Sequence, residues 1–364
     1  MIKSFENRQH GLDLVRVIAV LFVSFAHFTY TAHHRVDIST IGNFEPIVNV
    51  SNWTLLMPDI FLSHYLGTYL GTLGVTLFFI TTGYLMPLML QRYNRREFLL
   101  NRIFRIFPTL IVCTLITWLF ANWHNNQHFT ITHFWHSIFL TFQFYNIPSI
   151  IPVLWTLVIE MIFYFLCFII GQFNFFKVSC VLLTLFASCL GVHFFHVGIL
   201  EFILKYLFII FTGSLLYFLH TQNDINLWKK FFLGLYTIGF WYAIFTITES
   251  SSAYGRGSSI VISIGIVTLL LYFPLKQFPL ITLIADIVYP IYLLHFTFGL
   301  STMIFIKKTL SQNPYIMLIF AYIIVLLLSY IMHLLIEKPF YFYIKQKLRR
   351  SDYESCSIFT SKRN

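Results

Sequence analysis

The chain has 364 residues, of which 58% are hydrophobic and only 10% are charged, and its formal net charge is +10. A water-soluble domain of this composition would leave too much apolar surface facing water, so a soluble fold is excluded. The sequence therefore predicts an all-α, polytopic membrane protein built as a single bundle of helices.

About ten apolar windows are long enough to cross a bilayer. In chain order they cover residues 13–33, 60–90, 103–123, 151–171, 178–197, 201–220, 231–247, 258–274, 279–305 and 314–336. Turn-forming residues fill the segment between the first two windows, which reads as an exterior loop over about 34–59. We expect one transmembrane domain over residues 1–340 and a basic cytoplasmic tail over 341–364.

The positions of the basic residues predict the orientation. With both termini in the cytoplasm, all but five of the 24 Lys and Arg residues lie on the cytoplasmic side, the exceptions being Arg35, Lys205, Arg256, Lys307 and Lys308. This asymmetry is typical of the positive-inside rule. The positive charge is therefore expected to face anionic membrane lipids, and no nucleic-acid partner is expected because the chain has no soluble basic module.

The first apolar window carries a polar stripe. Arg16 and His27 are 11 residues apart, close to three helical turns, so they share one face and lie roughly 16 Å apart along the helix axis. Asp13 and Ser24 fall on the same stripe, which should face the protein interior or a wet cavity. A neutral imidazole is a natural general base, so His27 is the first candidate for catalysis. The alternatives are a hydrogen bond from His27 to another helix and an Arg16–Asp13 pair at the helix end.

Five arginines precede and enter the third window. The positive-inside rule alone accounts for Arg92, Arg95 and Arg96. Arg102 and Arg105 differ because their i, i+3 spacing at the start of a membrane helix lets both guanidinium groups converge on phosphate oxygens. They predict a site for a phosphorylated cytoplasmic ligand.

The fourth window contains Glu160 in an otherwise apolar run, with Tyr164 one helical turn later and Trp155 near its start. A carboxylate in a membrane helix is costly, and it is usually either functional or hydrogen-bonded to a neighbouring helix. Both interpretations of Glu160 stay open here. Trp155 is expected at the membrane interface. The segment 124–144 before it is either an interfacial helix or part of a longer fourth span.

Two further sets of polar residues remain, and both include histidine. Asp286 and His295 are nine residues apart and face opposite sides of a straight helix, unless Pro290 bends it; His295 is a second candidate for the site. A metal site is not expected at the other group, which reads as a solvated or interfacial run because no carboxylate accompanies it; its members are His124, His128, His133 and His136.

Six segments, in order along the chain, resemble the acyltransferase 3 family of integral-membrane acyltransferases. Arg16 and His27 match its Arg-x10-His motif, and Arg102, Arg105 and Pro108 match its Arg-x-x-Arg-x-x-Pro pattern. The remaining matches are GVTLFFITTGYLM, LWTLVIEMIFYF, YPIYLLHF and IEKPF. Thr82 and Thr156 replace family serines and keep the hydroxyl. Met161 stands where a second acidic residue is common, which argues against a paired-carboxylate mechanism at Glu160.

The resemblance implies an acyl-CoA donor, usually acetyl-CoA, taken from the cytoplasm. We expect Arg16, Arg102 and Arg105 to hold the CoA phosphates. His27 is expected to deprotonate the acceptor hydroxyl, with Asp13 and Glu160 as further catalytic residues, and substrate contacts are expected from Trp155, Tyr164 and His295. Direct transfer is the working hypothesis, and an acyl-enzyme relay through a hydroxyl is its alternative.

The resemblance also implies an acceptor at the outer face of a bacterial inner membrane. Many family members carry an attached hydrolase-like domain, which is not seen here, so the acceptor is expected to come to the membrane as a lipid-linked glycan, O-antigen or other surface polysaccharide. The alternative function is a transporter of a polar or acylated glycan intermediate, whose signature would be interrupted half-helices in paired repeats. The sequence leaves the acceptor sugar and the oligomeric state open.

Overall fold

The computed structural model describes residues 9–32, 47–48, 54–124, 129–195, 198–222, 230, 234, 253–273, 276, 278–343 and 346. Within these residues every regular element is a helix. In chain order the longer ones are α1 (His10–Ala26), α2 (Met57–Leu66), α3 (Leu70–Arg92), α4 (Arg95–His124), α5 (Ile131–Ile138), α7 (Leu154–Ile170), α8 (Phe175–Phe194), α9 (Gly198–Thr221), α11 (Ala253–Tyr272), α12 (Pro279–Leu294), α13 (Thr297–Thr309) and α14 (Pro314–Met332).

Six described helices are long and apolar enough to cross a membrane. They are the helix containing α1, then α3, α4, α8 and α9, and the helix that begins with α14. The pair α12 and α13, bent by 73° at a short break, adds a seventh if it counts as one span, and α7 and residues 257–272 of α11 are shorter apolar helices. The chain is thus a multi-pass membrane protein. The expected count of about ten stays a prediction, since window 231–247 lies almost entirely outside the described residues.

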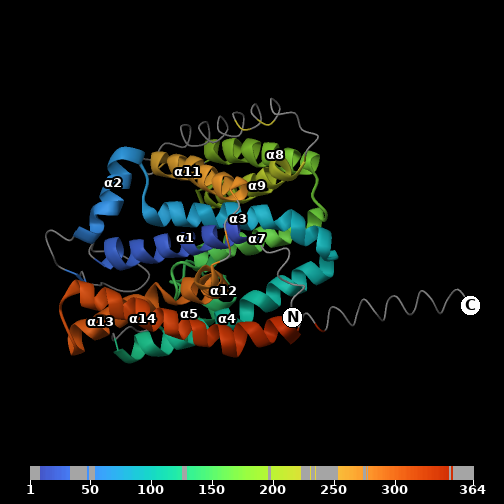
Figure 1. Ribbon diagram of the computed structural model, residues 1–364. Coiled ribbons are helices and arrows are strands. Elements are labelled where there is room, and N and C mark those ends of the chain that lie inside the picture. The colour runs from blue at the N-terminus through green and yellow to red at the C-terminus, as the bar shows by residue number, and fades with distance from the viewer. Residues whose placement is uncertain are drawn as a thin grey trace, which may run out of the picture.

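The centre of the bundle is formed by α1 and α3, which lie side by side with α9, α11 and α12 packed around them (Figure 1). Glycines let α3 and α9 approach at backbone distance: a Cβ atom added at Gly83 would collide with the carbonyl of Ile210, and one at Gly213 with that of Ile80. Ser214 also donates a hydrogen bond to the Gly83 carbonyl, at 2.8 Å. In lipid the hydrophobic effect does not drive helices together. Small residues at such crossings instead allow the close packing and hydrogen bonding that do.

The predicted window 60–90 is wrong as a single span. Its first part belongs to α2, a separate ten-residue helix that ends at Gly67 in the left-handed conformation, φ 58°. Figure 1 shows α2 lying across one end of α1 and α3 rather than along them. The predicted exterior loop is likewise shorter, because residues from Thr54 onward are helical; most of its remainder lies outside the described residues.

The structure also bears on several predictions about short segments and single residues. The segment before the fourth window forms the separate short helix α5, so the alternative of a longer fourth span is excluded. Pro290 lies inside α12 and the chain bends later, at His295–Phe296. Asp286 is exposed and His295 is fully buried, as their opposite faces predict. The last helix continues to Tyr343, past the predicted domain boundary, and most of the tail lies outside the described residues.

Candidate active site

His27 lies at the point where the first helix changes from an α-helix to a π-helix. The α-helical part ends at Ala26, and residues His27–Thr31 form a π-helical turn that extends the same helix. Such wide turns are frequent at functional sites, because they rotate the following side chains away from the α-helical register. Tyr30, which lies on this turn, reaches the same cavity as His27.

The His27 ring is hydrogen-bonded to a second histidine from the far end of the chain. Its Nδ1 lies 2.9 Å from Nε2 of His295, and the two rings are nearly parallel, with an interplanar angle of 18°. Phe296 packs edge-on against the His27 ring at 4.6 Å between centroids. His295 occupies the break between α12 and α13, so the break brings its ring to α1.

Backbone carbonyls assign the protons of this pair. Nδ1 of His295 lies 2.8 Å from the Tyr292 carbonyl and 3.3 Å from that of Ile291, both of which only accept hydrogen bonds. Nδ1 of His295 therefore carries the hydrogen, and its Nε2 accepts from Nδ1–H of His27. In the neutral tautomer that results, Nε2 of His27 carries the lone pair. This is the orienting logic of a catalytic triad, with a second histidine in the place of the usual carboxylate.

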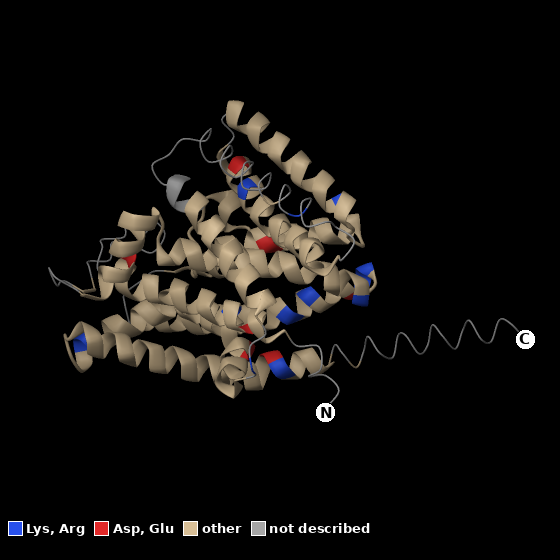
Figure 2. Cartoon of the chain, turned by 45° about the horizontal axis from the view of Figure 1, so that its top comes forward, with Lys and Arg blue, Asp and Glu red and all other residues tan. Residues whose placement is uncertain are grey.

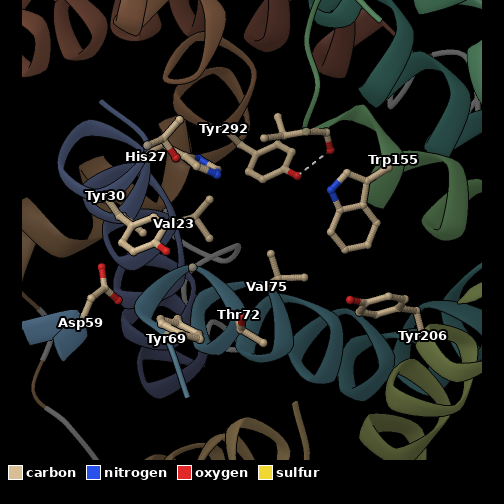
Figure 3. Close-up of a pocket in the computed structure, with 14 residues that line it drawn as sticks. Val23, His27, Tyr30, Asp59, Tyr69, Thr72, Val75, Trp155, Tyr206 and Tyr292 are labelled. Atoms are coloured by element: carbon tan, nitrogen blue, oxygen red, sulfur yellow. Dashed lines mark hydrogen bonds between the residues drawn. The ribbon is translucent and has the colours of Figure 1, made fainter. Parts of the chain in front are cut away.

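A cavity of about 410 Å³ opens beside His27. Figure 3 shows the side chains of Trp155, Tyr206 and Tyr292 across it from Val23 and Tyr30. Tyr292 donates a hydrogen bond to the Val153 carbonyl at 2.8 Å, drawn as a dashed line. Aromatic walls with a few polar groups are typical of a ligand site.

A second cavity, of about 130 Å³, contains the predicted arginines. Arg16 from α1 and Arg102 and Arg105 from α4 line it together. Thus the three arginines that the sequence assigns to one ligand do gather at one place. Glu160 and Tyr164 from α7 line the same cavity.

Arg102 is enclosed in the wall of this cavity. Its side chain is 6% exposed, and its Nε has no hydrogen-bond partner in the described part of the chain. The guanidinium carbon lies 5.2 Å from the centroid of the Tyr164 ring and 5.7 Å from that of Phe98, within cation–π range. A buried cation held by ring faces retains strong attraction for an anion that enters the cavity.

Glu160 is hydrogen-bonded rather than free. Its Oε1 accepts one hydrogen bond from the Tyr164 hydroxyl and another, at 3.5 Å, from the Thr82 hydroxyl. Thr82 therefore uses the hydroxyl that it shares with the family serine. This network fixes the wall of the arginine cavity and does not extend to His27.

Between the two cavities lies a small apolar pocket of about 10 Å³, which we call the apolar passage. It shares Val23, Val75 and Tyr292 with the His27 cavity, and Phe78 and Val288 with the arginine cavity. Phe78 and Tyr292 stack across it, 5.9 Å apart and 8° from parallel. The three spaces therefore form one line between α1, α3, α7 and α12, running from the arginines to the histidine pair.

The structure separates some of the residues that the sequence groups. Asp13 lines a different small cavity with His10 and Lys276, so the shared stripe does not bring it into the His27 or Arg16 cavities. Glu160 and Tyr164 belong with the arginines, which places them away from the histidine pair. Trp155 and His295 do lie beside His27.

Sequence reasoning missed several residues of the His27 cavity, namely Tyr30, Asp59, Tyr69, Tyr206 and Tyr292. A signal for Asp59 was present: the window 60–90 is longer than one span needs, and Gly67 and Thr68 interrupt it. The tyrosines had no such signal, because aromatic residues make up 20% of the chain.

The histidines of the 124–144 segment have local partners. His133 accepts from the Thr130 backbone N–H at 3.1 Å and caps α5, and His136 bonds the Thr141 hydroxyl at 2.8 Å. The His124 side chain and His128 lie outside the described residues. Among the side chains described, no group of three metal-ligating residues is found.

Comparison with known proteins identifies the family of the chain. The model of the acyltransferase 3 family, described as an acyltransferase domain, matches residues 9–334. No curated protein and no solved structure matches the chain. Because the family match covers almost the whole helical bundle and both cavities, the chain belongs to the acyltransferase 3 family and is a membrane acyltransferase.

Proposed function

We propose that the protein is an O-acetyltransferase that uses cytoplasmic acetyl-CoA and acetylates a hydroxyl of a surface glycan at the outer face of the bacterial inner membrane. The acceptor in this proposal is a lipid-linked glycan, O-antigen or lipopolysaccharide. The single observation that carries the proposal is the line of three spaces from the arginine cavity to the histidine pair. A donor with an anionic head and a long thin arm would follow that line once the apolar passage, whose volume is about that needed for one water molecule, widens to admit the arm.

The arginine cavity fits the head of CoA. Arg102 offers a buried guanidinium with an unused Nε, and Arg16 and Arg105 add two further cations beside it. Guanidinium groups bind phosphate oxygens in a bidentate manner, which suits a pyrophosphate. Among the described residues that line the cavity, the single carboxylate is Glu160, which accepts hydrogen bonds from two hydroxyls. The pantetheine arm would follow the apolar passage past Phe78 and Tyr292 toward His27.

The histidine pair supplies the proton transfers. Nε2 of His27 takes the proton of the acceptor hydroxyl while Nδ1–H stays bonded to His295. The hydroxyl oxygen forms a bond to the thioester carbonyl carbon, and the carbon–sulfur bond breaks. The proton on Nε2 of His27 then passes to the departing thiolate, so the ring returns to its neutral form. This is direct transfer, in which no acyl-enzyme is needed.

The distribution of charge supports an orientation with both termini in the cytoplasm. Figure 2 shows several basic residues toward the end of the bundle where the last described helix ends. Lys307 and Lys308 end α13, on a segment that the positive-inside rule assigns to the other side. In this orientation the arginine cavity opens toward cytoplasmic CoA and the His27 cavity toward the outer face.

Two measurements test the proposal. Mass spectrometry of surface glycans from cells with and without the protein should reveal an added acetyl group that disappears with the gene. Purified protein in lipid nanodiscs, given acetyl-CoA labelled in the acetyl group together with the glycan identified in this way, should label the glycan. Movement of an unlabelled glycan across a vesicle membrane without labelling would instead support the transporter and overturn the proposal.

A further inference from the structure

Asp59 is a buried carboxylate with one oxygen unused. Its side chain is 3% exposed, and Oδ1 accepts a hydrogen bond from the Leu70 backbone N–H at 2.7 Å. Oδ2 has no hydrogen-bond partner among the described residues. Burying a charged oxygen without a partner is costly, so such a group in a ligand cavity points to a ligand that supplies the missing donor.

Asp59 lies where two cavities meet. One is the 410 Å³ cavity of His27, and the other is a cavity of about 600 Å³ lined by α2. Asp59, Tyr30 and Tyr69 line both of them. Figure 3 shows these three side chains together on one side of the His27 cavity. The two tyrosine rings are 6.1 Å apart, and each residue is about two-fifths exposed.

A carboxylate beside exposed aromatic rings matches the chemistry of a sugar ring. The carboxylate oxygen accepts hydrogen bonds from hydroxyls, and each oxygen has room for two donors. The apolar C–H face of a pyranose packs on an aromatic ring, as other apolar groups do. His64 and Ser63 add polar groups to the α2 side of the same space.

The other face of α2 is apolar and exposed. Met57, Phe61 and Tyr65 are each more than half exposed and follow one another at intervals of four residues, about one helical turn. We expect this exposed apolar face to contact lipid at the membrane interface. A ligand bound under α2 therefore sits at the membrane surface, within reach of a sugar whose lipid carrier stays in the bilayer.

We propose that Asp59, Tyr30 and Tyr69 form the acceptor subsite, which binds a pyranose ring of a lipid-linked glycan by hydroxyl hydrogen bonds to Oδ2 and by stacking on the tyrosines. This rests on the proposed function for the role of the sugar as acceptor. The subsite opens directly into the His27 cavity, so a hydroxyl of the bound ring faces the base.

Asp59 also has a structural role, which the test must separate from ligand binding. Oδ1 ties α2 to the first turn of α3, and Asp59→Ala removes that bond together with the carboxylate. Asp59→Asn keeps a carbonyl oxygen for the Leu70 N–H and changes only the unused position to an amide. The matched control is Glu201→Gln, which alters a carboxylate of α9 that lines neither cavity and pairs with Lys205.

Saturation-transfer NMR with the full chain in lipid nanodiscs tests the subsite. The probes are methyl β-D-glucopyranoside, octyl β-D-glucopyranoside below its micelle-forming concentration, and the open-chain polyol glucitol. We expect transfer to the ring C–H protons of both pyranosides and none to glucitol. Asp59→Asn and Tyr69→Ala should each lower the signal at least about fivefold, whereas Tyr69→Phe and Glu201→Gln should leave it unchanged.

A substitution on the exposed apolar face of α2 tests whether the bound sugar comes from a lipid-linked glycan. Phe61→Ser should lower binding of the octyl glycoside and leave the methyl glycoside unaffected; an equal signal for both would overturn the lipid-linked source. Full pyranoside binding in Asp59→Asn, or glucitol binding equal to that of the pyranosides, would overturn the subsite itself. CoA binding measured on the same samples tests the donor side separately, so pyranoside binding without CoA binding would contradict the proposed function and leave the subsite standing.

Discussion

Nδ1 of His27 lies 2.9 Å from Nε2 of His295, although 268 residues separate the two histidines in the chain. The bond exists because α12 and α13 break at His295, which lets this ring reach the first helix. Since the Tyr292 carbonyl fixes the proton on His295, the pair holds Nε2 of His27 as the proton acceptor. In the proposed mechanism His295 is thus a positioning residue for His27.

Substitution of His295 should lower kcat more than it changes KM. His295→Ala removes the acceptor for Nδ1–H of His27, and we expect kcat to fall by about 10²-fold, within the range for a disturbed general base. His295→Gln offers a side-chain carbonyl in its place and should recover part of that loss. Steady-state kinetics in nanodiscs measure both. A His295→Ala enzyme with wild-type kcat would remove His295 from the mechanism.

The donor site is tested on the buried arginine. Arg102→Ala should weaken CoA binding by roughly 10- to 100-fold, because a hydrogen bond to a charged group contributes about 1.5–3 kcal/mol. Arg102→Lys should recover only part of the affinity, since an ammonium cannot bind phosphate in a bidentate manner. Isothermal titration calorimetry gives the dissociation constants, with Arg96→Ala, which alters an exposed arginine of the same helix, as the control. Equal CoA affinity of the Arg102→Ala variant and the wild type would contradict the assignment.

The apolar passage should control which acyl group passes. Phe78 and Tyr292 stack and both line the apolar passage, so Phe78→Ala should widen it and raise the rate with butyryl-CoA relative to acetyl-CoA by at least about fivefold. Competition between the two donors in one reaction measures this ratio. Phe79→Ala, which alters the neighbouring ring facing Trp155 and Tyr206, is the control. An unchanged ratio in Phe78→Ala would mean that the acyl group does not use this route.

Asp59 should make stability depend on pH in a definite direction. Burial raises the pKa of this carboxyl above its ordinary value of 3.8, against the opposing effect of the hydrogen bond from the Leu70 N–H. The folded protein therefore holds the Asp59 proton more tightly than the unfolded chain does. Its contribution to stability is greatest below pH 3.8 and is lost as the pH rises through the raised pKa.

Asp59→Asn has no carboxyl group to ionise at this position, so the variant does not lose this stability as the pH rises. The variant should melt at a higher temperature than the wild type at neutral pH, and the difference should shrink as the pH falls. Melting curves in detergent from pH 4 to 8 provide the test. A wild type that is the more stable at neutral pH would show that Oδ2 has a partner in the fold.

The sequence predicted the parts of the site that depend on helical spacing. Arg102 and Arg105 meet because they are one turn apart, and Arg16 joins them because its helix packs beside the same cavity. Asp13 was grouped with His27 on spacing alone, yet so long a helix face touches several different neighbours. The structure accordingly places Asp13 in a separate cavity.

Packing between helices that are distant in the chain determines features of the site that residue spacing cannot predict. The break at His295 and the crosswise course of α2 both depend on neighbouring helices, so neither the histidine pair nor the Asp59 junction follows from hydropathy. The approximate spans were predicted because lipid imposes length and apolarity on each helix separately. The window 60–90 was misread because α2 is also apolar on its exposed face.

The most direct test of the account is transfer by a His27→Ala protein. Purified in nanodiscs, it should bind CoA with wild-type affinity, because the arginine cavity is separate from the histidine pair. It should also melt at nearly the wild-type temperature. Its transfer of labelled acetyl to the glycan acceptor should fall by about 10²–10⁴-fold, the usual contribution of a general base. Transfer at the wild-type rate by this folded, CoA-binding variant would contradict the central claim that His27 is the base.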